Sequence, residues 1–335
     1  MTALIRARGH ALRLALGLGI LALVVWFVDL GATLRALHGA DPGWLLAALA
    51  AYVSTRGLVG VKWWILLGGR RETVSYATVQ RAVLLSDYHG LLFPNTLAID
   101  AFRAVLLRHH PRGWTHTAAS IVADRVINVA MAAGVALVAL GVTSLLLTAP
   151  FTPHVTLAVL AISGSIVVAA MAVASKRLFD LAIAVLHLTA ARGPLKPVVG
   201  RVLRKLAELH GAMRTMLTNP RIVVQAVLLA LVLVLMRCLS AYCAFRAIGV
   251  PVGLGWIITL MPVITTIALL PLTLFGLGLK DGAFVFFFSG IGIAASAALA
   301  VSFVTYGFII VTSVVLGLLA SVIGPPLPVA AKGES

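Results

Sequence analysis

The chain has 335 residues, of which 61% are hydrophobic and only 11% are charged, and its mean hydropathy is +1.09. A soluble domain carries roughly a quarter of its residues as Asp, Glu, Lys and Arg. This composition excludes a soluble enzyme. It predicts an all-α fold, a polytopic bundle of transmembrane helices.

Six apolar runs are long enough to cross a bilayer, since a spanning helix needs about 20 apolar residues. They cover residues 11–28, 43–67, 117–147, 155–174, 222–248 and 297–323. The first follows Arg6 and Arg8 and therefore also resembles a signal peptide. Because this run continues to Val28 without a clear small-residue cleavage site, we expect a membrane anchor.

Two further apolar stretches are long enough to span but are interrupted by helix breakers. They are residues 82–107 around Pro94, and residues 256–292 around Pro262, Pro271 and Gly276-Leu277-Gly278. Irregular backbone is tolerated at membrane depth only where it is buried in protein or lines a cavity. We therefore expect two broken hairpins beside the six full spans.

The basic residues predict the orientation, because short loops rich in Lys and Arg stay in the cytoplasm. Residues 176–221 carry nine basic side chains against two acidic ones, whereas residues 148–154 carry no Lys, Arg, Asp or Glu. This pattern predicts an inner or plasma membrane protein with both termini in the cytoplasm. The net charge of +16 then reflects loops beside an anionic leaflet, and we do not expect a nucleic-acid partner.

The orientation also predicts how the two broken stretches enter the membrane. Residues 82–107 lie between basic loops at 70–81 and 108–112, so this hairpin should enter and leave on the cytoplasmic side. The stretch 256–292 should enter from outside. Two broken elements of opposite polarity are typical of inverted-repeat transporters, but the identity between the two halves is too low to prove a repeat.

We expect residues 1–335 to form a single membrane domain with one long polar insertion, residues 176–221. Apolar and basic residues alternate on both sides of Arg192-Gly193-Pro194. The pattern indicates either two amphipathic helices at the membrane interface or a solvated basic linker that fixes the topology.

Charged side chains within the spans cost about 2.5–3.5 kcal/mol each at mid-membrane, so those present mark cavities, pairs or pathways. They are Arg56, Asp87, Asp100, Arg103, Asp124, Arg125, Arg237, Lys280 and Asp281. Lys62 lies close enough to the end of its span for its amine to reach the interface.

Spacing suggests partners for some of these charges. Asp100 and Arg103 are three residues apart and could pair on one helical face. Arg125 could bond to Asn128 and to an acid from another helix. The simplest interpretation is that such pairs hold the helices together without binding a ligand.

Five of the nine charges nevertheless lie in the two broken stretches, where backbone amides are also free. Lys280 and Asp281 open the helix after the glycine break, and the positive end of that helix could face an anionic group. A site of this kind would suit an amphiphile with a charged head and apolar tails.

At these residues the chain resembles the flippase-like family of the lysylphosphatidylglycerol synthase transmembrane region. Its members carry a Pro followed by Gly-Gly-Asp-x-x-Arg, then Glu-Arg-x-x-Asp, and late in the chain Gly-Gly-Leu-Gly-x-Arg-Glu. The corresponding residues here are Pro94-Asn95 with Asp100 and Arg103, then Asp124, Arg125 and Asn128, then Gly276, Gly278, Lys280 and Asp281.

The chain departs from the family pattern at several positions. Ala98 and Ile99 replace the two glycines, Asp124 replaces Glu, and Lys280-Asp281 replaces Arg-Glu. The sign of the charge is kept at Asp124, Lys280 and Asp281. It is lost at Asn128, where an Asp is usual.

The resemblance implies a domain that moves or accommodates phospholipids or isoprenoid-type lipids between leaflets, and some members are associated with hopanoids. We expect no soluble aminoacyl-transferase domain and therefore no lipid aminoacylation. From the interior charges and the family elements together, the expected substrate-binding residues are Arg56, Asp87, Pro94, Asn95, Asp100, Arg103, Asp124, Arg125, Asn128, Arg237, Gly276, Gly278, Lys280 and Asp281.

Other residues give no sign of a metal, a cofactor or a known catalytic motif. Cys238 and Cys243 lie within one span with no His nearby, so we expect them to pack in the interior as small apolar side chains. His109, His110 and His116 cluster in a loop that lacks an acid or Cys, so we expect a solvated loop. Neither a Walker-type loop nor a Gly-x-Ser-x-Gly elbow occurs.

Three functions remain open. The first is a lipid transporter that holds an anionic or zwitterionic headgroup near Arg103, Arg125 and Lys280. The second is a membrane transferase acting on a lipid-linked substrate, with Asp100 or Asp124 as base. The third is a non-catalytic partner of a lipid-synthesis enzyme.

Overall fold

The computed structural model describes residues 30–68, 74–91, 96–108, 113–146, 152–190, 196–270 and 278–323. These residues form helices and no strand, which confirms the all-α prediction. The helices are α2 (Leu30–His38), α3 (Pro42–Leu66), α4 (Tyr76–Gly90), α5 (Thr96–Leu106), α6 (Gly113–Leu146), α7 (Pro153–Ala174), α8 (Lys176–Ala190), α9 (Lys196–Leu217), α10 (Pro220–Ala247), α11 (Leu254–Ile267), α12 (Leu279–Ser289) and α13 (Ala295–Val322).

Five of these helices, α3, α6, α7, α10 and α13, are long and apolar enough to cross a membrane. They correspond to five of the six predicted spans, and the sixth, residues 11–28, lies outside the described residues. Large apolar side chains on their outer surface are exposed, for example Val138, which is 68% exposed, and Leu145, which is 85% exposed. An apolar outer surface is expected where lipid rather than water is the solvent.

The first broken stretch consists of α4 and α5, with Pro94 and Asn95 outside the described residues. The two helices pack closely, since a Cβ added to Gly90 would lie 2.4 Å from Cγ1 of Ile99. That the pair enters the membrane from one side stays a prediction.

The second broken stretch consists of α11 and α12, with Pro271 and Gly276 outside the described residues. The expectation of a break at Pro262 is wrong, because α11 continues through this residue. A proline inside a helix removes one backbone hydrogen bond, and membrane helices tolerate this loss when neighbouring groups satisfy the backbone. The bond lost here is the one to the carbonyl oxygen of Ile258; the hydroxyl of Thr266 donates instead to the carbonyl oxygen of Pro262 itself, at 2.8 Å.

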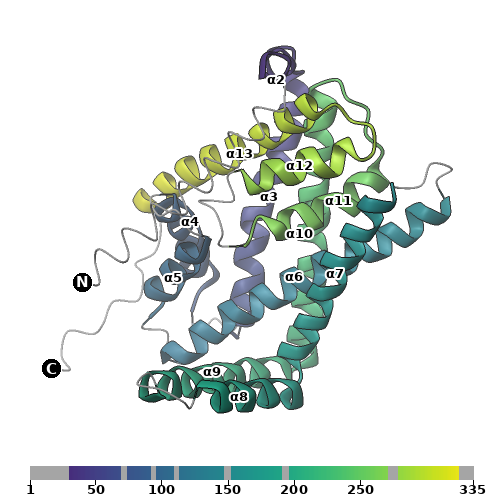
Figure 1. The fold of residues 1–335 in the computed structure, drawn as a ribbon. Helices are drawn as coiled ribbons and strands as arrows, with labels where there is room; N and C mark the ends of the chain where they lie inside the picture. The colour runs from purple at the N-terminus through teal and green to yellow at the C-terminus, as the bar shows by residue number, and fades with distance from the viewer. Residues whose placement is uncertain are drawn as a thin grey trace.

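Helices α8 and α9 lie side by side across one end of the bundle, and α2 lies at the opposite end (Figure 1). The ring of Phe179 on α8 stacks on the ring of His210 on α9, with centroids 3.7 Å apart. His210 also bonds to the carbonyl oxygen of Val173 at the end of α7. The buried side chains of Met213 and Met216 hold α9 against α6.

Helices α3, α6 and α10 pack together at the centre, and α4 and α13 flank α3. Ser240 on α10 donates to the carbonyl oxygen of Ala48 on α3 at 2.8 Å. Gly317 allows α13 to approach α4, since a Cβ there would lie 2.3 Å from Cβ of Tyr88. The charges of α3 meet those of α4 and α6 at these contacts, whereas Lys280 and Asp281 lie where α12 packs on α13.

Candidate functional site

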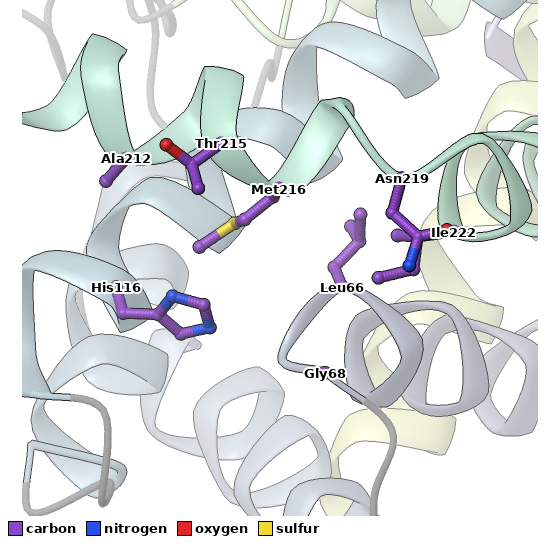
Figure 2. Close-up of a pocket in the computed structure, with 8 residues that line it drawn as sticks. All are labelled: Leu66, Gly68, His116, Ala212, Thr215, Met216, Asn219 and Ile222. Carbon is purple, nitrogen blue, oxygen red and sulfur yellow. The ribbon is translucent and has the colours of Figure 1, made fainter.

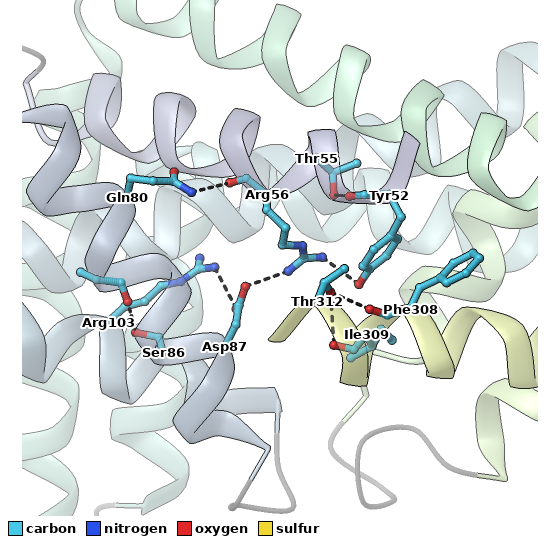
Figure 3. A network of polar contacts seen from close by, with 11 residues as sticks. Tyr52, Thr55, Arg56, Gln80, Ser86, Asp87, Arg103, Phe308, Ile309 and Thr312 are labelled. Carbon is cyan, nitrogen blue, oxygen red and sulfur yellow. Dashed lines mark hydrogen bonds and ion pairs between the residues drawn. The ribbon is translucent and has the colours of Figure 1, made fainter. Parts of the chain in front are cut away.

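Asp87 on α4 bridges two guanidinium groups from neighbouring helices (Figure 3). Its Oδ2 lies 2.9 Å from Nη1 of Arg56 on α3, and its Oδ1 lies 3.7 Å from Nη2 of Arg103 on α5. Arg56 also donates to the hydroxyl of Tyr52 at 2.9 Å. Tyr52 and Arg56 meet because residues four apart share one face of a helix.

This network is almost closed to the outside. Asp87 is 5% exposed and Arg103 is 8% exposed, and Nε of both Arg56 and Arg103 is buried without a hydrogen-bond partner. One carboxylate therefore balances two cations, which leaves the network with a net charge of +1.

A second network joins α3 to α6. Nζ of Lys62 lies 2.8 Å from Oδ1 of Asp124 and donates to Oδ1 of Asn128. Nδ2 of Asn128 in turn donates to Oδ2 of Asp124 at 3.2 Å. The contact between Asp124 Oδ1 and the Lys62 ammonium group is an ion pair.

The expectation that Lys62 reaches the interface is wrong, since this residue is 0% exposed. An ammonium group can remain in the interior when a carboxylate pairs with it and further hydrogen bonds satisfy its protons. Asp124 and Asn128 on α6 supply both.

The third ion pair corrects another expectation. Asp100 does not pair with Arg103 but accepts a hydrogen bond from Nε of Arg125 on α6, while Arg103 turns to Asp87. Asn128 likewise bonds to the Lys62–Asp124 pair.

Four polar side chains follow one another along α6 at intervals of four residues: His116, Ser120, Asp124 and Asn128. Residues four apart lie on nearly the same face of a helix. Ser120 accepts a hydrogen bond from the indole nitrogen of Trp63 at 2.9 Å, so this face meets α3. We call these four residues the α6 polar stripe; its length is about 18 Å at 1.5 Å per residue.

A cavity of about 500 Å³ lies at the His116 end of the α6 polar stripe. Figure 2 shows that the cavity lies between α9 and the ends of α3, α6 and α10. Its lining residues are Leu66, Gly68, His116, Ala212, Thr215, Met216, Asn219 and Ile222. We call it the α9 cavity.

A smaller cavity of about 50 Å³ lies at the other end of the stripe, between α6, α10 and α11. Its polar lining consists of Asn128, Arg237, Thr265 and Thr266, and the rest of the lining is mostly apolar. We call it the Arg237 cavity. The α6 polar stripe thus runs from one cavity to the other through the Lys62–Asp124 pair.

Lys280 and Asp281 lie apart from these networks, where α12 packs on α13. Asp281 accepts hydrogen bonds from the backbone amide of Gly278 at 2.9 Å and from the hydroxyl of Ser302 at 2.6 Å. Gly278 has a φ of 76°, a left-handed conformation that favours glycine. The chain's own carboxylate therefore occupies the positive end of α12.

Lys280 has no carboxylate within 4 Å among the described residues. Its Nζ donates to the hydroxyl of Thr305 and lies 3.9 Å from the ring centroid of Tyr306. Cation–π contact partly replaces an ion pair for a buried ammonium group.

Sequence reasoning missed Lys62, Tyr52 and Ser302 as members of these networks. The position of Tyr52, four residues before Arg56, is a signal that could have identified it. Lys62 could have been inferred only from the need of Asp124 for a cation. Among the described residues, no group of three or more His, Cys, Asp or Glu side chains could hold a metal ion.

Comparison with curated proteins and with solved structures found no match to this chain. One family model, described as the lysylphosphatidylglycerol synthase TM region, matches residues 11–317 and so includes every helix of the networks above. This match and the apolar helices identify a multi-pass membrane protein connected with lipid metabolism. The chain therefore belongs to the family of the lysylphosphatidylglycerol synthase transmembrane region.

Proposed function

We propose that the chain binds a lipid or lipid-linked amphiphile and moves its headgroup between leaflets along the α6 polar stripe. The observation that carries this proposal is the stripe itself, which extends from one cavity to the other. About 18 Å of polar surface is more than half the roughly 30 Å thickness of a hydrocarbon core. The acyl tails would stay in the bilayer beside the exposed apolar surface.

The buried ion pairs support the proposal because they are costly to maintain for packing alone. Well-packed apolar residues often stabilise a protein as much as a buried ion pair does or more. Four interhelical ion pairs involve Asp87, Asp100 and Asp124, and Asp124 belongs to the stripe itself. Any of these carboxylates could carry a coupled proton.

We assign the headgroup contacts to the charged residues of the three networks, to Asn128 and Arg237, and to Lys280 and Asp281. Pro94, Asn95, Gly276 and Gly278 belong to the proposed site by family resemblance. We further propose a location in the cell membrane with both termini in the cytoplasm, which places the α9 cavity at the cytoplasmic leaflet.

Vesicles that contain the purified protein and a phospholipid with a labelled headgroup test this function. In these vesicles, but not in protein-free ones, lipid labelled in the inner leaflet should move to the outer leaflet, where a membrane-impermeant quencher removes its fluorescence. Arg125→Ala should slow this transfer, because it removes the cation that pairs with Asp100. Arg204→Ala, an exposed change on α9, should leave it unchanged.

Equal transfer with and without protein would contradict the proposal. The lipid recovered from the vesicles should be chemically unaltered. A changed headgroup would instead identify a transferase, and stable co-purification of a lipid-synthesis enzyme without transfer would identify an accessory protein.

A further inference from the structure

Arg237 is a partly exposed cation within the bundle that has no counterion among the described residues. It lies on α10, well inside the span, and lines the Arg237 cavity. Its guanidinium makes no hydrogen bond and no ion pair with any residue in the described ranges.

The surrounding charges do not compensate this guanidinium. Arg56 and Lys62 lie within electrostatic range and repel it. Asp124 also lies within range and attracts it, but that carboxylate already pairs with Lys62. Asp87 and Asp100 are likewise committed to their own arginines.

Donors outnumber acceptors around the Arg237 cavity. A guanidinium offers five N–H groups, and Asn128 has a second amide hydrogen besides the one donated to Asp124. The hydroxyls of Thr265 and Thr266 both donate to the carbonyl oxygen of Pro262, so either can turn towards a stronger acceptor. An anion with several oxygens would satisfy these groups.

The size and shape of the site favour a phosphate group. A cavity of about 50 Å³ admits a compact group rather than a whole headgroup. The planar fork of a guanidinium matches two phosphate oxygens. Lining residues such as Leu233 and Met261 provide apolar surface beside that position.

We propose that Arg237, assisted by Asn128, binds the phosphate of a phospholipid or lipid phosphate. This inference rests on the proposed function and names the chemical group that the substrate must carry. It adds a phosphate subsite at the end of the α6 polar stripe remote from the α9 cavity.

Binding can be measured as ligand-induced thermal stabilisation of the delipidated, detergent-solubilised protein. Dioctanoyl phosphatidic acid should raise the unfolding temperature, whereas dioctanoylglycerol, which lacks the phosphate, should not. In Arg237→Met the apparent affinity for phosphatidic acid should fall about tenfold or more, the usual effect of losing a hydrogen bond to a charged group. Arg246→Met, an exposed change on the same helix, should bind like the unmodified chain.

Without ligand, Arg237→Met should unfold at the same or a higher temperature, because it removes an uncompensated charge. If this variant does not fold, Arg237→Lys keeps the charge but loses the fork, and its affinity should still be reduced. Unchanged affinity in either folded variant would overturn the proposal. Equal, Arg237-dependent stabilisation by inorganic phosphate alone would overturn its lipid part.

The same preparations separate this inference from the proposed function. Loss of phosphatidic acid binding in Arg237→Met together with no lipid transfer by the unmodified chain would support the subsite and contradict the transport function. Lipid transfer by the unmodified chain together with unchanged binding in Arg237→Met would support transport and contradict the subsite.

Discussion

Replacing Lys62 by Met should lower the free energy of unfolding by about 3–5 kcal/mol, because the buried carboxylate of Asp124 then has no cation. Lys62 is 0% exposed, so water cannot replace it without a rearrangement of α3 and α6. Asp124→Asn should have a similar cost, since it leaves the Lys62 ammonium group unpaired. Thermal unfolding in detergent measures both effects, with exposed Lys205→Met on α9 as the control.

The double variant Lys62→Met/Asp124→Asn separates packing from function. Removing both members of a buried pair costs much less than removing one, so most of the lost stability should return. Lipid transfer in vesicles should stay low, because the α6 polar stripe has lost the charge of Asp124 and the Lys62 ammonium group that pairs with it. If the double variant transfers lipid as fast as the unmodified chain, the Lys62–Asp124 pair serves only to hold α3 against α6.

Asp87→Asn should also destabilise the protein by about 3–5 kcal/mol, since one change leaves two buried guanidiniums without their carboxylate. Most of the lost stability should come from the contact of Asp87 with Arg56, at 2.9 Å, and less from its contact with Arg103, at 3.7 Å. Arg56→Met should therefore lower the unfolding temperature more than Arg103→Met does.

The matched control for Asp87 is Asp180→Asn, which removes an exposed carboxylate from α8. This change should shift the unfolding temperature little, because exposed ion pairs contribute only about 0–1 kcal/mol. Equal effects of Asp87→Asn and Asp180→Asn would show that the Asp87 network does not stabilise the interior.

Hydropathy was sufficient to predict the five long helices, because a membrane span must be apolar over most of its length. The short helix α2 was not predicted, since residues 30–38 lie in a loop between spans and have no long apolar run. The breaks could be placed only coarsely, because α11 continues through Pro262.

The partners of the interior charges were harder to predict than their positions. Pairing depends on how each helix is rotated about its axis, and spacing within one helix contains no such information. For this reason Asp100 pairs with Arg125 rather than with its neighbour Arg103. Lys62 was misjudged for the same reason, since only the packing of α3 on α6 places it beside Asp124.

The α6 polar stripe was partly visible in the sequence. His116, Ser120, Asp124 and Asn128 recur every four residues. The expectation that His116 lies in a solvated loop hid this pattern and is wrong, because α6 begins at Gly113 and His116 is partly buried in it. Only the two cavities at its ends indicate a functional role for the stripe. Sequence alone could not predict these cavities, because they are formed by helices distant in sequence.

Photo-cross-linking with a phospholipid that carries a diazirine in its headgroup tests the central claim most directly. If headgroups travel along the α6 polar stripe, mass spectrometry should find cross-links deep in the bundle, at residues such as Val129 and Leu233 of the Arg237 cavity. A control lipid with the diazirine at the end of an acyl chain should label outer residues such as Val138. Headgroup cross-links confined to the helix ends would contradict the account.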